Sequence, residues 1–163
     1  MSAAQRIQEL GLEFPPAPKP LGVYKPLLIV GNLAYISGHV PLLPDGTLLK
    51  GRVGQDVDQQ AGYQAARQVG LAVLATLQAG LGSLDRVQRI VKTLGMVNCT
   101  TDFHQLPAVV NGFSELMAQV FGPDQGVGAR SVLGASSLPG NIPVEVEAIF
   151  EIAVGQAFQP DEL

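Results

Sequence analysis

The stretch GARSVLGASSLPGNIPVEVEAIFEIA, residues 128–153, decides how this chain folds. Its second half alternates between apolar and other residues, which predicts a strand with one face against a core and the other face open. The apolar set is Val144, Val146, Ala148, Phe150 and Ile152, and the opposite set includes Glu145, Glu147 and Glu151. The first half is typical of a second strand, and Leu-Pro-Gly-Asn at 138–141 is a turn sequence between the two.

The charges of this stretch have two open interpretations. One cation, Arg130, is followed by fourteen uncharged residues and then by Glu145 and Glu147. In the first interpretation the glutamates face water and Arg130 is their surface partner, as is ordinary for a strand with one buried face. In the second interpretation these charges line a binding site.

Two helices with apolar stripes are predicted upstream. Asp56 or Asp58 can cap a long helix that ends at the Gly-Leu-Gly of residues 80–82. A second helix begins near Pro107, a residue suited to the first helical turn, and ends at Gly122. Both stripes predict core faces packed on a sheet. They consist of Val69, Val73, Leu77 and Leu81 in the first helix, and Val109, Phe113, Leu116, Met117 and Val120 in the second.

The remaining strands complete an α+β fold. Residues 26–30 and 34–40 are predicted strands joined by a tight turn at Gly31-Asn32, and 86–98 is another strand. A third early strand is possible around 48–54. Strands interleaved with two helices predict a mixed β-sheet with both helices packed on one face.

Composition excludes several functional classes. The chain has 163 residues, the length of one domain, with 47% hydrophobic and only 15% charged residues. This composition favours an oligomer that covers part of the surface, and a compact monomer with a polar, uncharged surface is the alternative. Its net charge is −4 and its ten basic residues are scattered, so we expect no nucleic-acid partner. Cys99 is the single cysteine, and His39 and His104 lack metal-ligand spacing, so we expect no disulfide and no metal.

A membrane location is also not expected. The first fourteen residues carry charges of both signs and lack the apolar centre of a signal peptide. The longest apolar run, residues 27–30, is far too short to span a bilayer. We therefore expect a soluble, cytoplasmic protein without a membrane partner.

The order and spacing of several motifs resemble those of the Rid (YjgF) family of reactive-intermediate imine deaminases. Arg130, fourteen residues that include Leu-Pro, and then Val-Glu-Val-Glu-Ala are similar to the family's carboxy-terminal signature. Tyr24, followed after thirteen residues by Gly38 within ISGHVP, resembles its amino-terminal tyrosine and Ser-Gly-Gln-Ile-Pro-like strand. VQRIVKTLGMVNCTTDF and Asn111 resemble its strand and second helix, so that the resemblance covers about residues 20–153.

The resemblance implies a chorismate-mutase-like (YjgF-like) fold assembled as a homotrimer with a barrel-like centre and three clefts between subunits. The chain then divides into an amino-terminal extension at 1–19, with a short helix over 3–10 and a proline-rich linker, a single domain at 20–155, and a carboxy-terminal tail at 156–163. The glutamate faces of the sheets would meet around the centre, so neighbouring chains would cover them.

The resemblance also implies roles for single residues. Arg130 would bind the substrate carboxylate through its planar guanidinium. Glu145 would orient the attacking water and carry its proton. Tyr24, Gly38, Asn111 and Val132 would complete the substrate-binding set, Val132 through its backbone amide and Gly38 by permitting close approach. No organic cofactor or metal is needed for this hydrolysis.

The chain departs from the family's pattern at several positions. Val132 stands where many members have cysteine, His39 stands where glutamine is usual, and residues 123–128 form an extra loop. We expect His39 to be a packed or hydrogen-bonded residue and Cys99 to be an inert residue of the core.

Three functions remain open. The first is hydrolysis of reactive imines or enamines derived from amino acids, which needs both Arg130 and Glu145. The second is a non-catalytic, ligand-binding or regulatory trimer that binds small carboxylates and needs only the arginine. The third is an endoribonuclease, an activity attributed to some relatives, which the acidic charge of this chain disfavours. A chorismate-mutase reaction rests on fold analogy alone.

Overall fold

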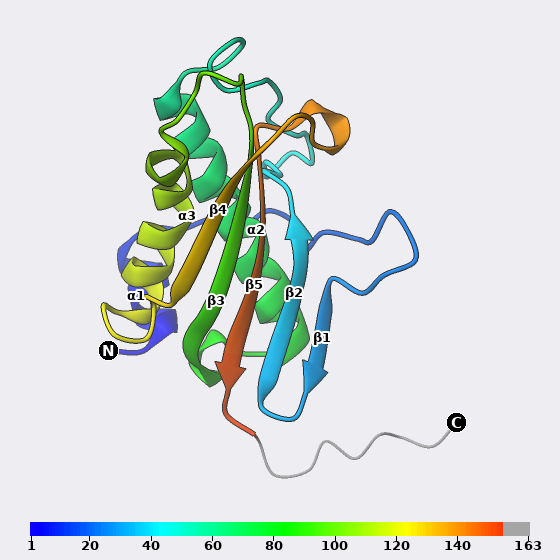
Figure 1. The fold of residues 1–163 in the computed structure, drawn as a ribbon. Coiled ribbons are helices and arrows are strands. Elements are labelled where there is room, and N and C mark those ends of the chain that lie inside the picture. Colours follow the sequence, from blue (N-terminus) through cyan, green and yellow to red (C-terminus); the bar gives the residue numbers. More distant parts are fainter. Residues whose placement is uncertain (155–163) are drawn as a thin grey trace.

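One five-stranded sheet, in the order β1-β2-β5-β3-β4, forms the centre of the fold (Figure 1). The computed structural model describes residues 1–154, so the predicted tail at 156–163 lies outside the described residues. Strands β3 and β4 run parallel and all other neighbours are antiparallel, which makes the sheet mixed, as predicted. The elements are α1 (Ala3–Glu9), β1 (Leu27–Val30), β2 (Leu33–His39), α2 (Gln59–Leu81), η1 (Leu84–Arg86), β3 (Val87–Asn98), α3 (Leu106–Phe121), β4 (Ala129–Ala135), η2 (Pro139–Asn141) and β5 (Val144–Ile152).

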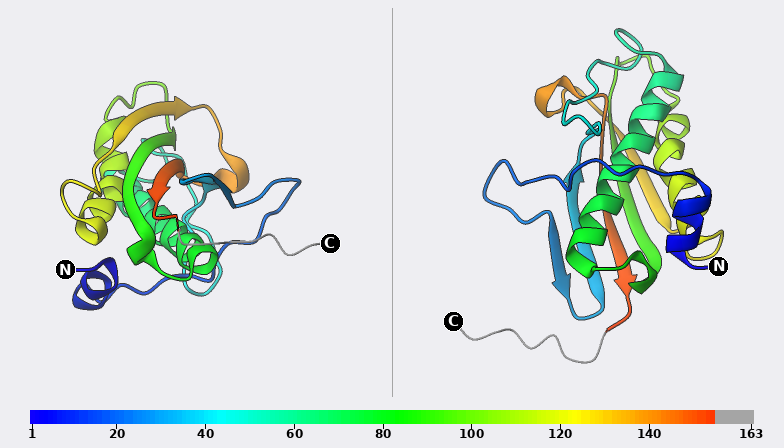
Figure 2. Two further views of the ribbon diagram at one scale, coloured as in Figure 1. Left: turned by 90° about the horizontal axis from the view of Figure 1, so that it is seen from below. Right: turned by 180° about the vertical axis from the view of Figure 1, so that it is seen from behind.

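Helices α2 and α3 lie against the same face of the sheet, as their apolar stripes predict (Figure 2). The Asp58 carboxylate accepts a hydrogen bond from the Ala61 amide at 2.7 Å and starts α2. Gly82 ends this helix with a φ of 78°, a left-handed conformation that favours glycine. Helix α3 has Pro107 in its first turn and ends at Gly122, so both predicted helices are confirmed.

The core lies between these helices and the sheet. All predicted stripe residues of the two helices and the whole apolar set of β5 are buried. The Phe121 ring meets the Phe150 ring edge to face, with centroids 6.1 Å apart. The helices approach so closely that a Cβ on Gly112 would overlap the Tyr63 carbonyl. The alternation of β5 and the two helical stripes therefore describe a single apolar core.

The possible strand around 48–54 is not a strand. Leu48 and Val53 form only isolated bridges, because Gly51 and Gly54 have φ values of 126° and 89° that break the extended backbone. The segment is instead tied to the end of β3, where the Val53 amide donates to the Asn98 carbonyl at 2.8 Å. The loop that carries Arg52 is thereby fixed beside the carboxyl end of β3.

The short helix α1 folds back onto α3 and η1 (Figure 2). Ser2 starts it with a reciprocal pair of hydrogen bonds to Gln5. Arg6 Nη1 donates to the Val120 carbonyl at 3.3 Å, near the end of α3. Residues 123–128 follow directly, so α1 supports the helix end from which this loop starts.

The second face of the sheet carries no helix of residues 1–154. Strand pairing places Leu28 opposite Tyr35, and Met96 opposite both Leu133 and Glu145. The side chains of Leu28, Tyr35 and Leu133 are 40–55% exposed. An open face with this apolar content is a candidate interface. Among residues 1–154, no helix is both long enough and apolar enough to cross a bilayer.

Candidate functional site

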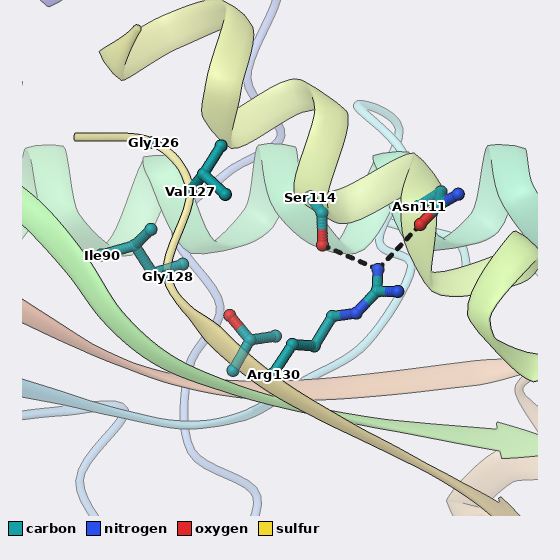
Figure 3. A pocket seen from close by; sticks show the side chains of 8 residues that line it. Ile90, Asn111, Ser114, Gly126, Val127, Gly128 and Arg130 are labelled. Carbon is teal, nitrogen blue, oxygen red and sulfur yellow. Dashed lines mark hydrogen bonds between the residues drawn. The ribbon is translucent and has the colours of Figure 1, made fainter. Parts of the chain in front are cut away.

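Arg130 lies on β4 at the edge of the sheet and points toward α3 (Figure 3). It pairs with Thr93 of β3, whose side chain is buried on the helix side. Arg130 Nη1 donates to Asn111 Oδ1 at 2.8 Å and to Ser114 Oγ at 3.1 Å. Helix α3 therefore holds the guanidinium in one orientation, and two residues of the predicted substrate-binding set, Arg130 and Asn111, are in direct contact.

A hollow of about 240 Å³ opens beside the guanidinium, with Val127 and Gly128 of the preceding loop on its far wall (Figure 3). Nη2 and Nε of Arg130 donate no hydrogen bond to a residue of the described range 1–154, and no carboxylate of that range forms an ion pair with it. A guanidinium that is fixed through one nitrogen and free at the others can bind a carboxylate with two hydrogen bonds.

Gly38 and Glu145 face each other at a bulge between β2 and β5. The pairing of Ile36 with Ala148 and of His39 with Val146 leaves one extra residue in β2. Gly38 lies within this bulge, and a Cβ there would overlap the Glu145 carboxylate. Any larger residue here would force the flexible Glu145 side chain to move, so the absent side chain of Gly38 lets the carboxylate lie against the β2 backbone.

The Glu145 carboxyl is half-buried on the open face. Burial raises its pKa above the ordinary value of a glutamate, and the neighbouring Glu147 carboxylate raises it further. A carboxyl group with a raised pKa gives up and takes back a proton closer to neutral pH. Such a group is suited to general acid-base work.

Tyr24 lies close to Gly38. It borders a small hollow of about 80 Å³ together with Gly38, His39 and the prolines Pro18 and Pro26. The ring is half exposed, and its hydroxyl accepts a hydrogen bond from the Leu21 amide at 3.4 Å. Tyr24 can therefore form one wall of a binding site at the bulge that contains Gly38.

His39 is buried and hydrogen-bonded, as expected from the sequence. Its Nδ1 lies 2.7 Å from the Ser37 carbonyl and its Nε2 lies 2.7 Å from Thr76 Oγ1 of α2. Burial lowers the pKa of the imidazole, and the hydrogen bond to Ser37 opposes this only in part. The neutral ring ties the bulge to α2 and turns away from the open face.

Cys99 is also buried, as expected from the sequence, and burial raises the pKa of its thiol. Within residues 1–154, no three His, Cys, Asp or Glu side chains lie close enough to hold a metal ion.

The predicted site residues form two groups on opposite faces of the sheet. Arg130 and Val132 share the face that packs on the helices, because their partners Thr93 and Gly95 are buried there. Glu145 pairs with Met96 and points to the open face. One chain thus brings Arg130 to Asn111, and brings Gly38 to Glu145 and Tyr24, but it does not bring the two groups together.

Sequence reasoning missed Ser114 and Thr93. Ser114 lies three residues after Asn111 on α3, on the same helix face, so the spacing from Asn111 was a usable signal. Thr93 lies beside Arg130 only through the parallel pairing of β3 with β4. That pairing joins distant segments and leaves no local trace in the sequence.

The family model described as "YjgF/chorismate_mutase-like, putative endoribonuclease" matches residues 4–151. The chain belongs to this YjgF family. The predicted Rid (YjgF) resemblance and the YjgF-like α+β fold are thereby confirmed.

Several known proteins are similar to this chain over most of its length. Protein TCP17 of Trypanosoma cruzi is 36% identical over 149 residues, which are 91% of this chain and 93% of that protein. A solved structure of a protein of unknown function from Agrobacterium tumefaciens is 37% identical, with a TM-score of 0.83 and coverage of 93% and 94% of the two chains. The 2-iminobutanoate/2-iminopropanoate deaminase of Dermatophagoides farinae is 27% identical over 139 residues, covering 85% of this chain and 92% of the relative.

Proposed function

We propose that this protein hydrolyses reactive imines or enamines derived from amino acids to a keto acid and ammonia, at clefts between the subunits of a homotrimer. One observation carries the proposal. Helix α3 holds the Arg130 guanidinium in place, and the Glu145 carboxyl has a raised pKa, yet the two groups lie on opposite faces of the sheet. A second copy of the chain can supply Glu145, Gly38 and Tyr24 to the Arg130 of the first.

The open face of the sheet supports the assembly. Leu28, Tyr35 and Leu133 leave a partly apolar surface around Glu145 and Glu147. Closed rings of identical subunits form when one surface patch fits a different patch of the next copy. Packing the open faces around a three-fold axis would cover this surface and bring the edge strand β4 of one chain beside the bulge of the next. Light scattering that gives a monomer at micromolar concentration would contradict the shared site.

The chemistry follows from these groups. Arg130 binds the carboxylate that an amino-acid imine carries, and so fixes the imine carbon. The oxygen of a water molecule forms a bond to that carbon while Glu145 accepts a proton from the water. The π electrons of the carbon–nitrogen double bond move to the nitrogen, which receives that proton from Glu145 and becomes the amino group of a carbinolamine. Glu145 then takes the proton of the new hydroxyl and passes it to the nitrogen as the carbon–nitrogen single bond breaks, so that ammonia leaves and the carbonyl of the keto acid forms. The site therefore needs one group that orients the substrate, Arg130, and one group that carries protons, Glu145.

The relatives lend support of different kinds. The name of the Dermatophagoides farinae protein describes an imine deaminase, which agrees with this proposal. The name of the family model mentions endoribonucleases. This chain has a net charge of −4 and scattered basic residues, and RNA binding depends on a basic surface, so we do not propose that activity.

A direct assay separates the deaminase from a trimer that only binds carboxylates. An amino-acid oxidase generates the imine in place, and the rate of ammonia release is measured with and without the protein. Glu145→Gln is nearly isosteric and should lower the protein-dependent rate by about 10²–10⁴-fold. It should spare binding of a keto acid such as 2-oxobutyrate, measured by calorimetry. Glu147→Gln, on the same strand face, is the matched control and should change the rate less. Ammonia release at the wild-type rate by Glu145→Gln would rule out the hydrolytic role.

A further inference from the structure

A third hollow, of about 300 Å³, lies at the carboxyl ends of the parallel strands β3 and β4. The first turn of α3 and the loop that carries Arg52 form its other walls. In Figure 1 this is the upper end of the molecule, where α3 begins. The hollow shares no lining residue with the hollow beside Arg130, which lies near the opposite end of β4. It is therefore a separate site and does not depend on the proposed imine hydrolysis.

The hollow is kept open by Gly134. A Cβ at this position would lie 3.3 Å from Cys99 Sγ and 3.7 Å from Leu106 Cδ1, and both of these residues line the hollow. A larger side chain at 134 would therefore project into the space between them. The backbone of Gly134 does not have the positive φ that would itself require glycine. The absent side chain matters here because it leaves room.

Arg52 is the cation of this hollow, and the chain around it is fixed. Its Nε donates to the Cys99 carbonyl at 2.9 Å, and its backbone amide donates to the Asp56 carboxylate at 2.9 Å. The Arg52 carbonyl accepts three backbone hydrogen bonds from the turn that follows. Nη1 and Nη2 donate no hydrogen bond within residues 1–154, and no carboxylate of that range forms an ion pair with the guanidinium. A held guanidinium with two free nitrogens is the arrangement that binds a carboxylate in a planar fork.

The other walls define the rest of the ligand. Phe103 and Leu106 supply half-buried apolar surface, and the exposed residues Thr101, His104 and Ser136 also line the hollow. Asp102 is the acid that follows Thr101, and it is fully exposed and does not line the hollow. A ligand with one negative charge and an apolar body matches this lining, because few fixed polar groups in an apolar cleft set the orientation of a bound small molecule.

We propose that this hollow binds a small monocarboxylate, with its carboxylate on Arg52 and its apolar body on Phe103 and Leu106. Arg52 is the one lining residue that is always positively charged, and one guanidinium neutralises one negative charge, so a monocarboxylate fits it better than a dianionic phosphate does. The volume of the hollow suits an aromatic ring or a short branched chain.

The test uses phenylacetate as the probe and 2-phenylethanol, which lacks the charge, as its matched control. Backbone amide chemical shifts of the whole protein are recorded during titration with each compound. We expect saturable shifts at Thr101 and Gly134 with phenylacetate, and at least about tenfold weaker binding of the alcohol, since the fork contacts are lost. Shifts confined to the neighbourhood of Gly128, at the Arg130 hollow, would overturn the proposal.

Two variants each change a different wall of the hollow. Arg52→Gln removes the fork, and Gly134→Val fills the space while leaving the Arg52 loop unchanged. Each should weaken phenylacetate binding at Thr101 by about tenfold or more, whereas Arg130→Ala should not change it. Unchanged affinity in Gly134→Val, or no saturable shift at Thr101 in the wild-type protein up to about 10 mM phenylacetate, would disprove the site.

Discussion

Replacing Gly38 with alanine tests the contact between the β2 bulge and Glu145. The new Cβ would overlap the Glu145 carboxylate and lie 2.9 Å from its Cδ and 3.2 Å from its Cγ. Carbon and oxygen atoms in contact prefer about 3.5 Å or more, so the overlapping carboxylate oxygen must move by more than about 1 Å. A displacement of this size in a catalytic group costs about 10²-fold in rate, which is about 2.7 kcal/mol of transition-state stabilisation.

The assay is the imine-hydrolysis rate of Gly38→Ala together with its urea midpoint. We expect the rate to fall by about 100-fold, while stability changes by no more than about 1 kcal/mol, because Glu145 is half-buried and can turn toward solvent. The double variant Gly38→Ala/Glu145→Gln should be no slower than Glu145→Gln alone, since both changes remove the same group. Fully additive losses, or a wild-type rate in Gly38→Ala, would refute this reasoning.

Three further results are expected. Arg130→Lys keeps the charge but loses the planar fork, so we expect weaker pyruvate binding by calorimetry and slower imine hydrolysis. Arg130→Ala should lose about 2 to 4 kcal/mol of pyruvate binding free energy, and unchanged binding in this variant would contradict the role of Arg130. Burial lowers the pKa of His39 in the folded protein, so protons bind the unfolded chain more readily, and the stability that the neutral ring contributes should be lost as pH falls below about 6.5. Urea midpoints measured between about pH 7.5 and 5 should therefore fall more steeply for the wild-type protein than for His39→Gln, and parallel curves would disprove the assignment. RNA should be neither bound nor cut at physiological salt, and cleavage that disappears in Arg130→Ala would overturn that expectation.

The secondary structure was predictable because it depends on local periodicity. The stripes of α2 and α3 and the alternation along β5 each fix a buried face without reference to distant segments. The segment 48–54 was misjudged because its apolar residues suggested a strand, whereas Gly51 and Gly54 adopt left-handed backbone conformations. A glycine can lie in an extended strand or in a left-handed turn, and the sequence does not show which of the two conformations Gly51 and Gly54 adopt.

The geometry of the candidate site was only partly predictable. Its residues could be named from motif order, but the face on which Arg130 lies depends on how β4 pairs with β3. That pairing joins segments far apart in the sequence, and a shift of one residue would move Arg130 to the open face. The bulge that brings Gly38 to Glu145 likewise depends on β2 and β5 together.

The most direct test of a site shared between chains is complementation between two inactive variants. Arg130→Ala and Glu145→Gln chains are unfolded together in equal amounts, refolded, and assayed for imine hydrolysis. Each intact cleft needs its arginine from a Glu145→Gln chain and its glutamate from an Arg130→Ala chain, with probability one half for each. About a quarter of the clefts, and hence about a quarter of the wild-type rate, should therefore be recovered in randomly mixed trimers. A mixture no more active than the average of the two separate variants would contradict the shared site.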